Sequence, residues 1–330
     1  MKVTVNGKIL RTWPRLAAMG VLLGAVLVLR LVLGTTGFSL QLDLVTERFW
    51  RLLPAVIIGV ALAGSGVSLQ ALLRNPLAEP FILGLSTGAA AGVMAQKALA
   101  YYLQIELSFS GAGALVGAIV SMAVVLLLSR RQGVIDPLGL LLTGIVLATI
   151  GGALVMAFNA VSPSGLRNDL AVWMMGYLGL WSGGWTIMIV GGVTAASLGI
   201  LLWQAPAMDV ATLSEAEARS IGVNLAQLRL LLFLVAAASS AGTVVLAGPI
   251  AFVGLIAPHL TRLLVGPRHQ SVLIGAALMG PALVVAADVG AAALNWICGI
   301  GTLPIGVLTA LFGGPVFLWL LRPQLGRAMS

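Results

Sequence analysis

The stretch "LLRNPLAEPFILGLSTG", Leu72 to Gly88, contains a short polar segment with two prolines, in a chain that is otherwise almost entirely apolar. Long apolar runs lie on both sides of it, at 50–73 and 80–97. Asn75-Pro76 disfavours continuation of a helix, whereas Pro80 suits the first turn of the next one. Glu79 would complement the positive N-terminal end of that second helix. The stretch therefore predicts two apolar helices joined by a polar turn.

The composition of the whole chain extends this pattern. With 60% hydrophobic and 8% charged residues and a mean hydropathy of +1.09 over 330 residues, the chain has too little polar surface to coat a soluble globule. Segments such as "VSMAVVLLLS" are apolar on every face, whereas the strands of a membrane barrel would alternate apolar and polar residues. We therefore expect an all-α integral membrane protein that forms a single domain over 1–330.

Charged and proline-rich breaks divide the chain into about ten spans, most of them close to the 20 apolar residues that a crossing helix needs. The first span follows a basic N-terminus that resembles a signal peptide, but it continues without a convincing cleavage site, so we interpret it as retained. An even number of spans places both termini on one side. The predicted spans are 14–34, 50–73, 80–97, 109–129, 138–160, 183–203, 227–247, 250–264, 271–293 and 304–321.

The positions of the basic residues choose that side. Thirteen of the eighteen lie in segments on the side of the termini, and the opposite segments hold only Arg48, Arg51, Lys97 and Arg167. The positive-inside rule therefore predicts cytoplasmic termini, and it explains the net charge of +8 better than nucleic-acid binding does. Arg30 lies near the outer end of the first span, where its long stem is expected to reach the membrane interface.

The longest predicted cytoplasmic segment is 204–229, "QAPAMDVATLSEAEARSIGVNLAQLR". Ser214 and Glu217 in it have capping-box spacing, and Gly222 is a plausible C-terminal stop. A second helix is expected to begin near Asn224. These signals predict a surface helix of about two turns, which favours a docking surface for another protein over a plain connecting loop.

The sequence lacks several kinds of chemistry. None of its three lysines follows glycine and precedes serine or threonine, as a nucleotide-binding loop requires. Asp288 is almost the only ionisable residue in the later spans, which gives little support to ion coupling; a structural partner or a proton site would explain it. His259 and Arg262 indicate an interface or capping role, and Cys298 a small core residue. We therefore expect neither an enzyme nor a metal site.

Five motifs in order resemble the FecCD-type permease subunits of ABC importers, which take up ferric siderophores, haem and cobalamin. The resemblance runs nearly end to end. The motifs are "SGVSLQALLRNPLAEPFILGLSTGA" at 65–89, "WMMGYLG" at 173–179, "LSEAEARSIGV" at 213–223, "GPIAFVGLIAPHLTR" at 248–262 and "LPIGVLTALFGGPVFLWLL" at 303–321.

This resemblance implies a type II ABC importer permease with about ten spans in the bacterial cytoplasmic (inner) membrane. It implies a second permease copy, most simply an identical one, two cytoplasmic ATPase subunits that bind ATP and Mg²⁺, and an extracytoplasmic substrate-binding protein. The chain itself would bind no cofactor. Ferric siderophore is the first choice of cargo, with haem and cobalamin behind it.

The resemblance also implies roles for particular residues. Outer docking of the binding protein would fall to Arg48 and Arg51. The pathway wall would come from spans five and ten of both copies. Two departures from the family pattern are Ala292, in place of an arginine, and Thr302, in place of a glutamate, so part of the docking surface is expected to differ. Coupling to the ATPase is assigned to Ser214, Glu215, Glu217, Arg219 and Gly222, and the inner turn and gate to Asn75, Pro76, Glu79, Asp136, Pro137 and Leu138.

Two other classes of protein remain as alternatives. An ion-coupled secondary transporter would work without an ATPase, in a liposome that holds only an ion gradient. An intramembrane enzyme would need a convergent set of acid, base or metal ligands, which the residue inventory does not provide.

Overall fold

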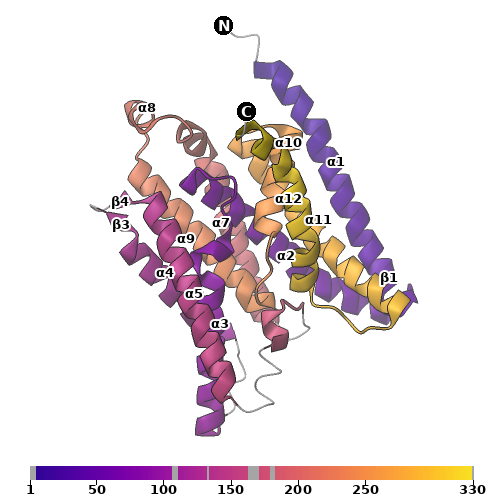
Figure 1. The fold of residues 1–330 in the computed structure, drawn as a ribbon. Helices are drawn as coiled ribbons and strands as arrows, with labels where there is room; N and C mark the ends of the chain where they lie inside the picture. Colours follow the sequence, from indigo (N-terminus) through magenta and orange to yellow (C-terminus); the bar gives the residue numbers. More distant parts are fainter. Residues whose placement is uncertain (1–4, 106–110, 132–133, 163–170, 179–182, 329–330) are drawn as a thin grey trace.

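The computed structural model describes residues 5–105, 111–131, 134–162, 171–178 and 183–328, and these form a bundle of long helices (Figure 1). The long helices are α1 (Val5–Val32), α2 (Leu42–Leu73), α3 (Leu85–Leu103), α4 (Gly111–Leu128), α5 (Pro137–Val161), α7 (Gly184–Val210), α9 (Leu225–Ala247), α10 (Val253–Val265), α11 (His269–Cys298) and α12 (Ile305–Ala328). The short elements are η1 (Pro80–Leu83), α8 (Glu215–Ser220) and the strands β1 (Leu33–Gly34), β2 (Gly37–Phe38), β3 (Arg130–Arg131) and β4 (Val134–Ile135).

A helix lies at each of the ten predicted spans. Seven of the described helices are long and apolar enough to cross a membrane, and Val253–Val265 and Ile305–Leu320 are shorter apolar helices. α2 begins eight residues before the predicted start of span two, at Leu42 instead of residue 50. The all-α membrane fold predicted from the sequence is confirmed.

The eighth predicted span, 250–264, is shorter than expected. Its helix, α10, has 13 residues, and at 1.5 Å per residue it extends only about 20 Å, less than the hydrocarbon thickness of a bilayer. The segment before it is not helical, and Phe252 adopts a left-handed conformation with φ of 68°. Backbone atoms of Gly254 lie against the buried Gly66 of α2, so α10 begins inside the bundle.

Helix α2 is the centre of the bundle, because it packs against α7, α9, α10 and α11. In its most apolar 18-residue window 78% of the residues are buried, against 11% for the window in α1. Glycines allow these close approaches: a side chain on Gly59 would collide with the backbone at Gly280 and Pro281 of α11. Close contacts between small residues hold helices together in lipid, because apolar side chains gain little free energy when they move from lipid into a helix interface.

The glycines of spans three and four are spaced four residues apart, a pattern that predicts close packing of helices in lipid, and the two rows meet each other. Gly92 faces the backbone of Gly113, and Gly117 faces that of Gly88, so that a side chain at any of these four would overlap the opposite helix. The stripe continues to Gly84, where the left-handed φ of 71° joins η1 to α3. The packing role inferred from the four-residue spacing is confirmed.

The two ends of the bundle differ. α1 begins and α12 ends at the end of the bundle that also carries α8 (Figure 1), as expected from an even number of spans. The opposite end carries the hairpin in which Leu33 of β1 pairs with Phe38 of β2. A second hairpin pairs Arg130 of β3 with Ile135 of β4 between α4 and α5. Following the positive-inside assignment, we call the α8 end cytoplasmic and the β1 end outer.

Candidate functional sites at the two ends of the bundle

The cytoplasmic helix α8 has the capping box that its sequence predicts. The Ser214 backbone N–H donates to Glu217 Oε2 at 3.0 Å, and the Glu217 N–H donates to Ser214 Oγ at 3.3 Å. Hydrogen bonds from Ser214 hold the pKa of Glu217 below its usual value. At the other end Gly222 has φ of 92°, a conformation that glycine adopts readily. The helix therefore begins and ends where the local signals place it.

Glu215 ties α8 to the helix that follows. Its carboxylate accepts from Arg229 on α9 at 2.5 Å and from Arg219, one helical turn away, at 3.3 Å. These arginines, Arg229 first, lower the pKa of Glu215. A third contact joins α8 to α2, because Arg74 Nη2 donates to the Leu213 carbonyl at 2.9 Å. Displacement of α8 would therefore pull on both α9 and α2.

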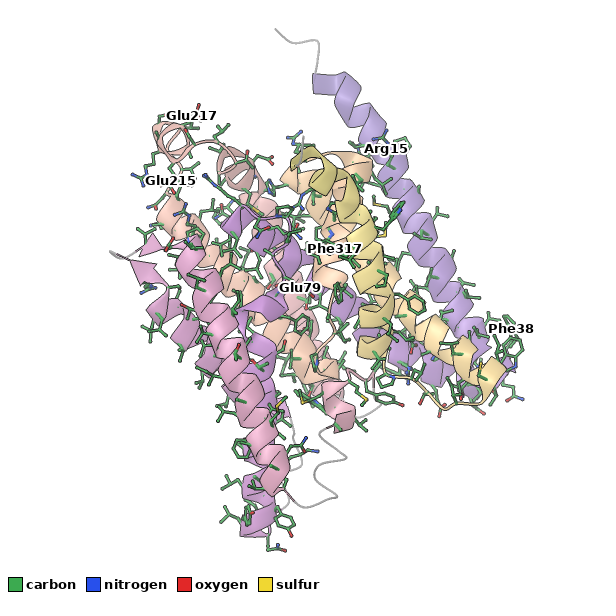
Figure 2. The ribbon with its side chains drawn as sticks, viewed as in Figure 1. Arg15, Phe38, Glu79, Glu215, Glu217 and Phe317 are labelled. Carbon is green, nitrogen blue, oxygen red and sulfur yellow. The ribbon has the colours of Figure 1, made fainter. Side chains whose placement is uncertain are left out.

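The turn 75–79 reaches further into the protein than a surface turn would. Asn75 Oδ1 accepts from the Leu77 N–H at 2.9 Å, and Pro76 and Leu77 are exposed, but Ala78, Glu79 and Pro80 are buried. Figure 2 shows Glu79 part-way along the bundle, away from Glu215 and Glu217. The interpretation of the whole stretch as a cytoplasmic turn is therefore wrong for its second half, which turns back between the helices.

Glu79 has a specific partner there. Its carboxylate accepts from the backbone N–H of Phe252 at 2.5 Å, just before α10 begins. This contact is not with the helix that follows Glu79, as expected from the sequence, but with one 173 residues away. Glu79 thereby fixes the residue whose backbone has the unusual left-handed conformation, and a part-buried N–H finds an acceptor.

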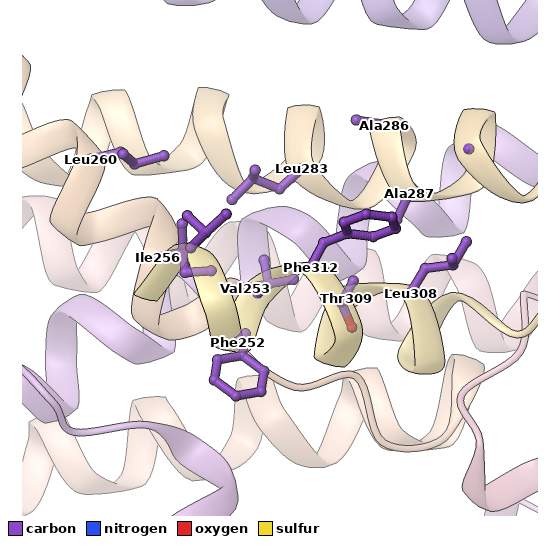
Figure 3. Close-up of a pocket in the computed structure, with 13 residues that line it drawn as sticks. Phe252, Val253, Ile256, Leu260, Leu283, Ala286, Ala287, Leu308, Thr309 and Phe312 are labelled. Carbon is purple, nitrogen blue, oxygen red and sulfur yellow. The ribbon is translucent and has the colours of Figure 1, made fainter. Parts of the chain in front are cut away.

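Phe252 also borders an apolar cavity between α10, α11 and α12. The cavity measures about 280 Å³, and Thr309 is the only residue with a side-chain hydroxyl or other polar group in its lining (Figure 3). The Phe252 side chain lies close to Gly313 of α12, where a larger residue would overlap it. The lining suits hydrocarbon and offers nothing that would hold a charged group. It includes Val253, Ile256, Leu260, Leu283, Ala287, Leu308 and Phe312.

The remaining gate candidates lie at the start of α5. Asp136 caps this helix, since its Oδ2 accepts from the Gly139 N–H at 3.1 Å. Pro137 occupies the first turn, and the Leu138 side chain is 64% exposed. Asp136 and Pro137 thus have clear roles in beginning the helix, and a role in gating stays a prediction.

An ion-pair cluster lies at the outer end. Asp288 on α11 accepts from Arg30 Nε at 2.5 Å and from Arg51 Nη2 at 2.9 Å. The Asp288 side chain is 1% exposed and that of Arg30 5%. The interpretation of Arg30 as an arginine that reaches the membrane interface is therefore wrong: it is a buried partner of Asp288. Of the two explanations offered for Asp288, the pairing supports the structural one.

The two arginines expected to dock a binding protein are largely committed to the fold. Arg48 is buried, and its Nη1 donates to the carbonyls of Leu31, Val32 and Ser39 at 2.8–2.9 Å. It thereby satisfies the C-terminal end of α1, where carbonyls lack partners within the helix. Arg51 pairs with Asp288 and lies 5.5 Å from the centre of the Tyr177 ring. Docking of a binding protein by these two arginines stays a prediction.

The two departures from the family pattern lie near this cluster. Ala292 is buried on α11, one turn beyond Asp288. Thr302 is exposed. One signal in the sequence points to the whole cluster, namely that charged residues inside a span need partners, but it does not specify which partners.

The family of the chain follows from comparison with known proteins. The model of the FecCD transport family matches residues 15–323. The chain belongs to the FecCD transport family. It is therefore a multi-pass membrane permease, as the motifs and the fold had indicated, and the inner membrane of a bacterium is its expected location.

Several relatives in this family share about a third of the sequence. The hemin transport system permease protein of Yersinia pestis is 36% identical, over 84% of this chain and 82% of its own length. The cobalamin import system permease protein of Halobacterium salinarum is also 36% identical, over 86% and 74%. The Fe(3+)-citrate import system permease protein of Bacillus subtilis is 34% identical, over 87% and 83%.

A solved structure has the same fold. It is described as an inward-facing conformation of a metal-chelate type ABC transporter, and it aligns with a TM-score of 0.82 at 31% identity. The alignment covers 93% of this chain and 98% of the other. The FecCD fold thus extends over nearly the whole chain.

Proposed function

We propose that this FecCD permease is the membrane subunit of an ATP-driven importer that carries a metal chelate into a bacterial cell. The observation that carries the proposal is α8, a capped helix on the cytoplasmic end that ion pairs and hydrogen bonds tie to α9 and α2. Such a helix can receive force from a partner outside the membrane. The family match and the metal-chelate transporter of the same fold support it.

The energy would come from two cytoplasmic ATPase subunits, because the sequence holds no nucleotide-binding loop of its own. Binding of ATP and Mg²⁺ by those subunits would draw them together and displace α8. The Glu215–Arg229 pair would carry the displacement to α9, and the Arg74–Leu213 bond would carry it to α2. Access to the pathway would change because one arrangement of the helices binds the closed ATPase pair better than the other.

Two further partners complete the proposed importer. A second copy of this permease would enclose the pathway, with α5 and α12 of both copies as its wall; their exposed apolar side chains, such as Leu142 and Phe312, support this placement. An extracytoplasmic binding protein would deliver the cargo to the outer end. Arg51, which pairs with Asp288 but keeps 17% of its side chain exposed, would be the residue that meets a carboxylate on that protein, whereas Arg48 is buried.

Ferric siderophore is the proposed cargo, with haem and cobalamin as the alternatives. Relatives named for hemin and for Fe(3+)-citrate import support an iron chelate, and a relative named for cobalamin import, at similar identity, keeps cobalamin as an alternative. The test is a panel of the three cargoes, each loaded on the cognate binding protein and offered to liposomes that hold the full complex and internal ATP. Selective accumulation of the ferric siderophore would support the assignment. Accumulation of haem or cobalamin instead would contradict it and name the cargo.

A further inference from the structure

A second cytoplasmic feature lies beside α8. The hairpin pocket, a hollow of about 460 Å³, is bounded on one side by Val134 of the β3–β4 hairpin and on the other by the segment from α8 to α9. Arg219 and Arg229 line it together with Gly222, Val223 and Asn224. The hairpin is attached to the bundle because Ile135, next to Val134, is buried and β4 packs on α9.

The charges around the hairpin pocket do not balance. Arg219 and Arg229 both pair with the single carboxylate of Glu215, so one positive charge remains. The Glu217 carboxylate is turned to Ser214 by hydrogen bonds from its N–H and its hydroxyl group. Arg130 of the hairpin is exposed nearby in sequence and adds to the excess. A partner that enters here should carry negative charge.

Exposed apolar side chains lie in the same cytoplasmic segments as the residues that line the hairpin pocket. Ile221 is 60% exposed, Leu213 42% and Val134 36%, and all three lie in connecting segments between spans at the cytoplasmic end. Lipid covers exposed apolar side chains on the spans, but it does not cover residues beyond them. Apolar side chains grouped with arginines are typical of protein interfaces.

We propose that the hairpin pocket is a second docking point for the ATPase subunit, and that it takes an acidic side chain of that subunit while a neighbouring apolar one rests on Val134. This inference rests on the proposed function, since it assumes an ATPase partner at α8. Asp136, which caps α5, donates its N–H to the Ser129 carbonyl at the base of the hairpin, so the ATPase would contact α5 through the hairpin as well as α9 through α8.

Site-specific photo-crosslinking tests this proposal. A benzoylphenylalanine replaces Val134 in one sample and Ile221 in another, each in the full chain assembled with its ATPase in lipid nanodiscs. We expect adducts with the ATPase from both positions, and we expect the Val134 adduct to map to an ATPase peptide that carries Asp or Glu. An adduct from Ile221, with none or only a lipid adduct from Val134, would overturn the inference and leave the proposed function intact. Failure at both positions would overturn both.

Filling the pocket provides a second measurement. Val134→Trp should weaken association of the ATPase about tenfold by occupying the space of the acidic side chain, a change that binding assays resolve easily. Val134→Ala, which leaves the space open, should change the affinity by less than about threefold. Equal affinities for Val134→Trp and the parent protein, in samples that elute as the same assembled species, would overturn the inference.

Discussion

Arg30 Nε on α1 lies 2.5 Å from Asp288 Oδ2 on α11, and both side chains are almost completely buried. The pair joins the first long helix to one of the central helices at the outer end. Arg51 on α2 approaches the other carboxylate oxygen at 2.9 Å. One aspartate therefore links α1, α2 and α11. Removal of a single partner from such a buried pair leaves an uncompensated charge, which is far more costly than replacing the whole pair.

Asp288→Asn is therefore expected to destabilise the protein by about 3–5 kcal/mol. Thermal unfolding of the purified full chain in detergent measures the effect as a lower melting temperature. Glu47→Gln is the matched control, because it also removes an acidic charge near the outer end but from an exposed residue. Equal melting temperatures for Asp288→Asn and the parent protein would show that the pair does not hold these helices together.

The capping box predicts a different kind of loss. Ser214→Ala should destabilise α8 by about 1 kcal/mol, because the Glu217 N–H loses its acceptor. Hydrogen exchange of the amides in 214–222 should become faster while exchange within the long helices stays the same. Ser214→Thr keeps a hydroxyl acceptor and should leave exchange close to that of the parent protein. Unchanged exchange in Ser214→Ala would mean that packing, and not the cap, maintains α8.

The Glu215–Arg229 pair predicts loss and rescue of coupling. Glu215→Arg places like charges beside Arg229 and should reduce stimulation of the partner ATPase by cargo-loaded binding protein, with membrane insertion unchanged. The double variant Glu215→Arg, Arg229→Glu reverses the pair and should recover much of that stimulation. If the single variant couples normally, the pair does not transmit the movement of α8.

The same pair has a defined pH dependence. The arginines lower the pKa of Glu215 from its usual value of 4.5 in the folded chain. Stability from a carboxylate with a lowered pKa is present above its unfolded pKa and is lost as the pH falls through the folded value. The difference in melting temperature between the parent protein and Glu215→Gln should thus be constant from pH 8 to about 6 and shrink only below about 4. A difference that shrinks between pH 8 and 6 would contradict this pairing.

Local patterns account for much of the cytoplasmic site. Ser214 and Glu217 are three residues apart and the glycines of α3 four apart, and these spacings specify a cap and a packing stripe without knowledge of the rest of the fold. Hydrophobic length likewise placed the ten helices. In each of these cases the interacting residues lie within one helix, or the spacing of the residues itself defines the helix face that packs.

Contacts between distant segments were not predictable in the same way. The partner of Arg30 is 258 residues away and that of Glu79 is 173 residues away, and nothing near either residue specifies it. The short length of α10 was also missed, because "GPIAFVGLIAPHLTR" is apolar from its start, whereas the helix begins only after the left-handed residue Phe252. An apolar sequence pattern predicts which residues are buried, but it does not predict their backbone conformation.

Glu79 provides a test of this long-range contact. Glu79→Ala leaves the part-buried Phe252 N–H without this acceptor and should destabilise the protein by about 1 kcal/mol. Glu79→Gln retains an oxygen that can accept the same hydrogen bond, so its melting temperature should lie closer to that of the parent protein. If both variants melt at the same temperature as the parent, the Glu79 side chain does not hold the start of α10.

We propose that this FecCD permease depends on an ATPase and not on an ion gradient. The most direct measurement is chelate uptake into liposomes that hold the permease, its ATPase and its binding protein, compared with liposomes that hold the permease alone and an imposed proton or sodium gradient. We expect accumulation in the first case only when ATP is enclosed, and no accumulation in the second. Uptake by the permease alone under an ion gradient would rule out this dependence on an ATPase and identify a secondary transporter.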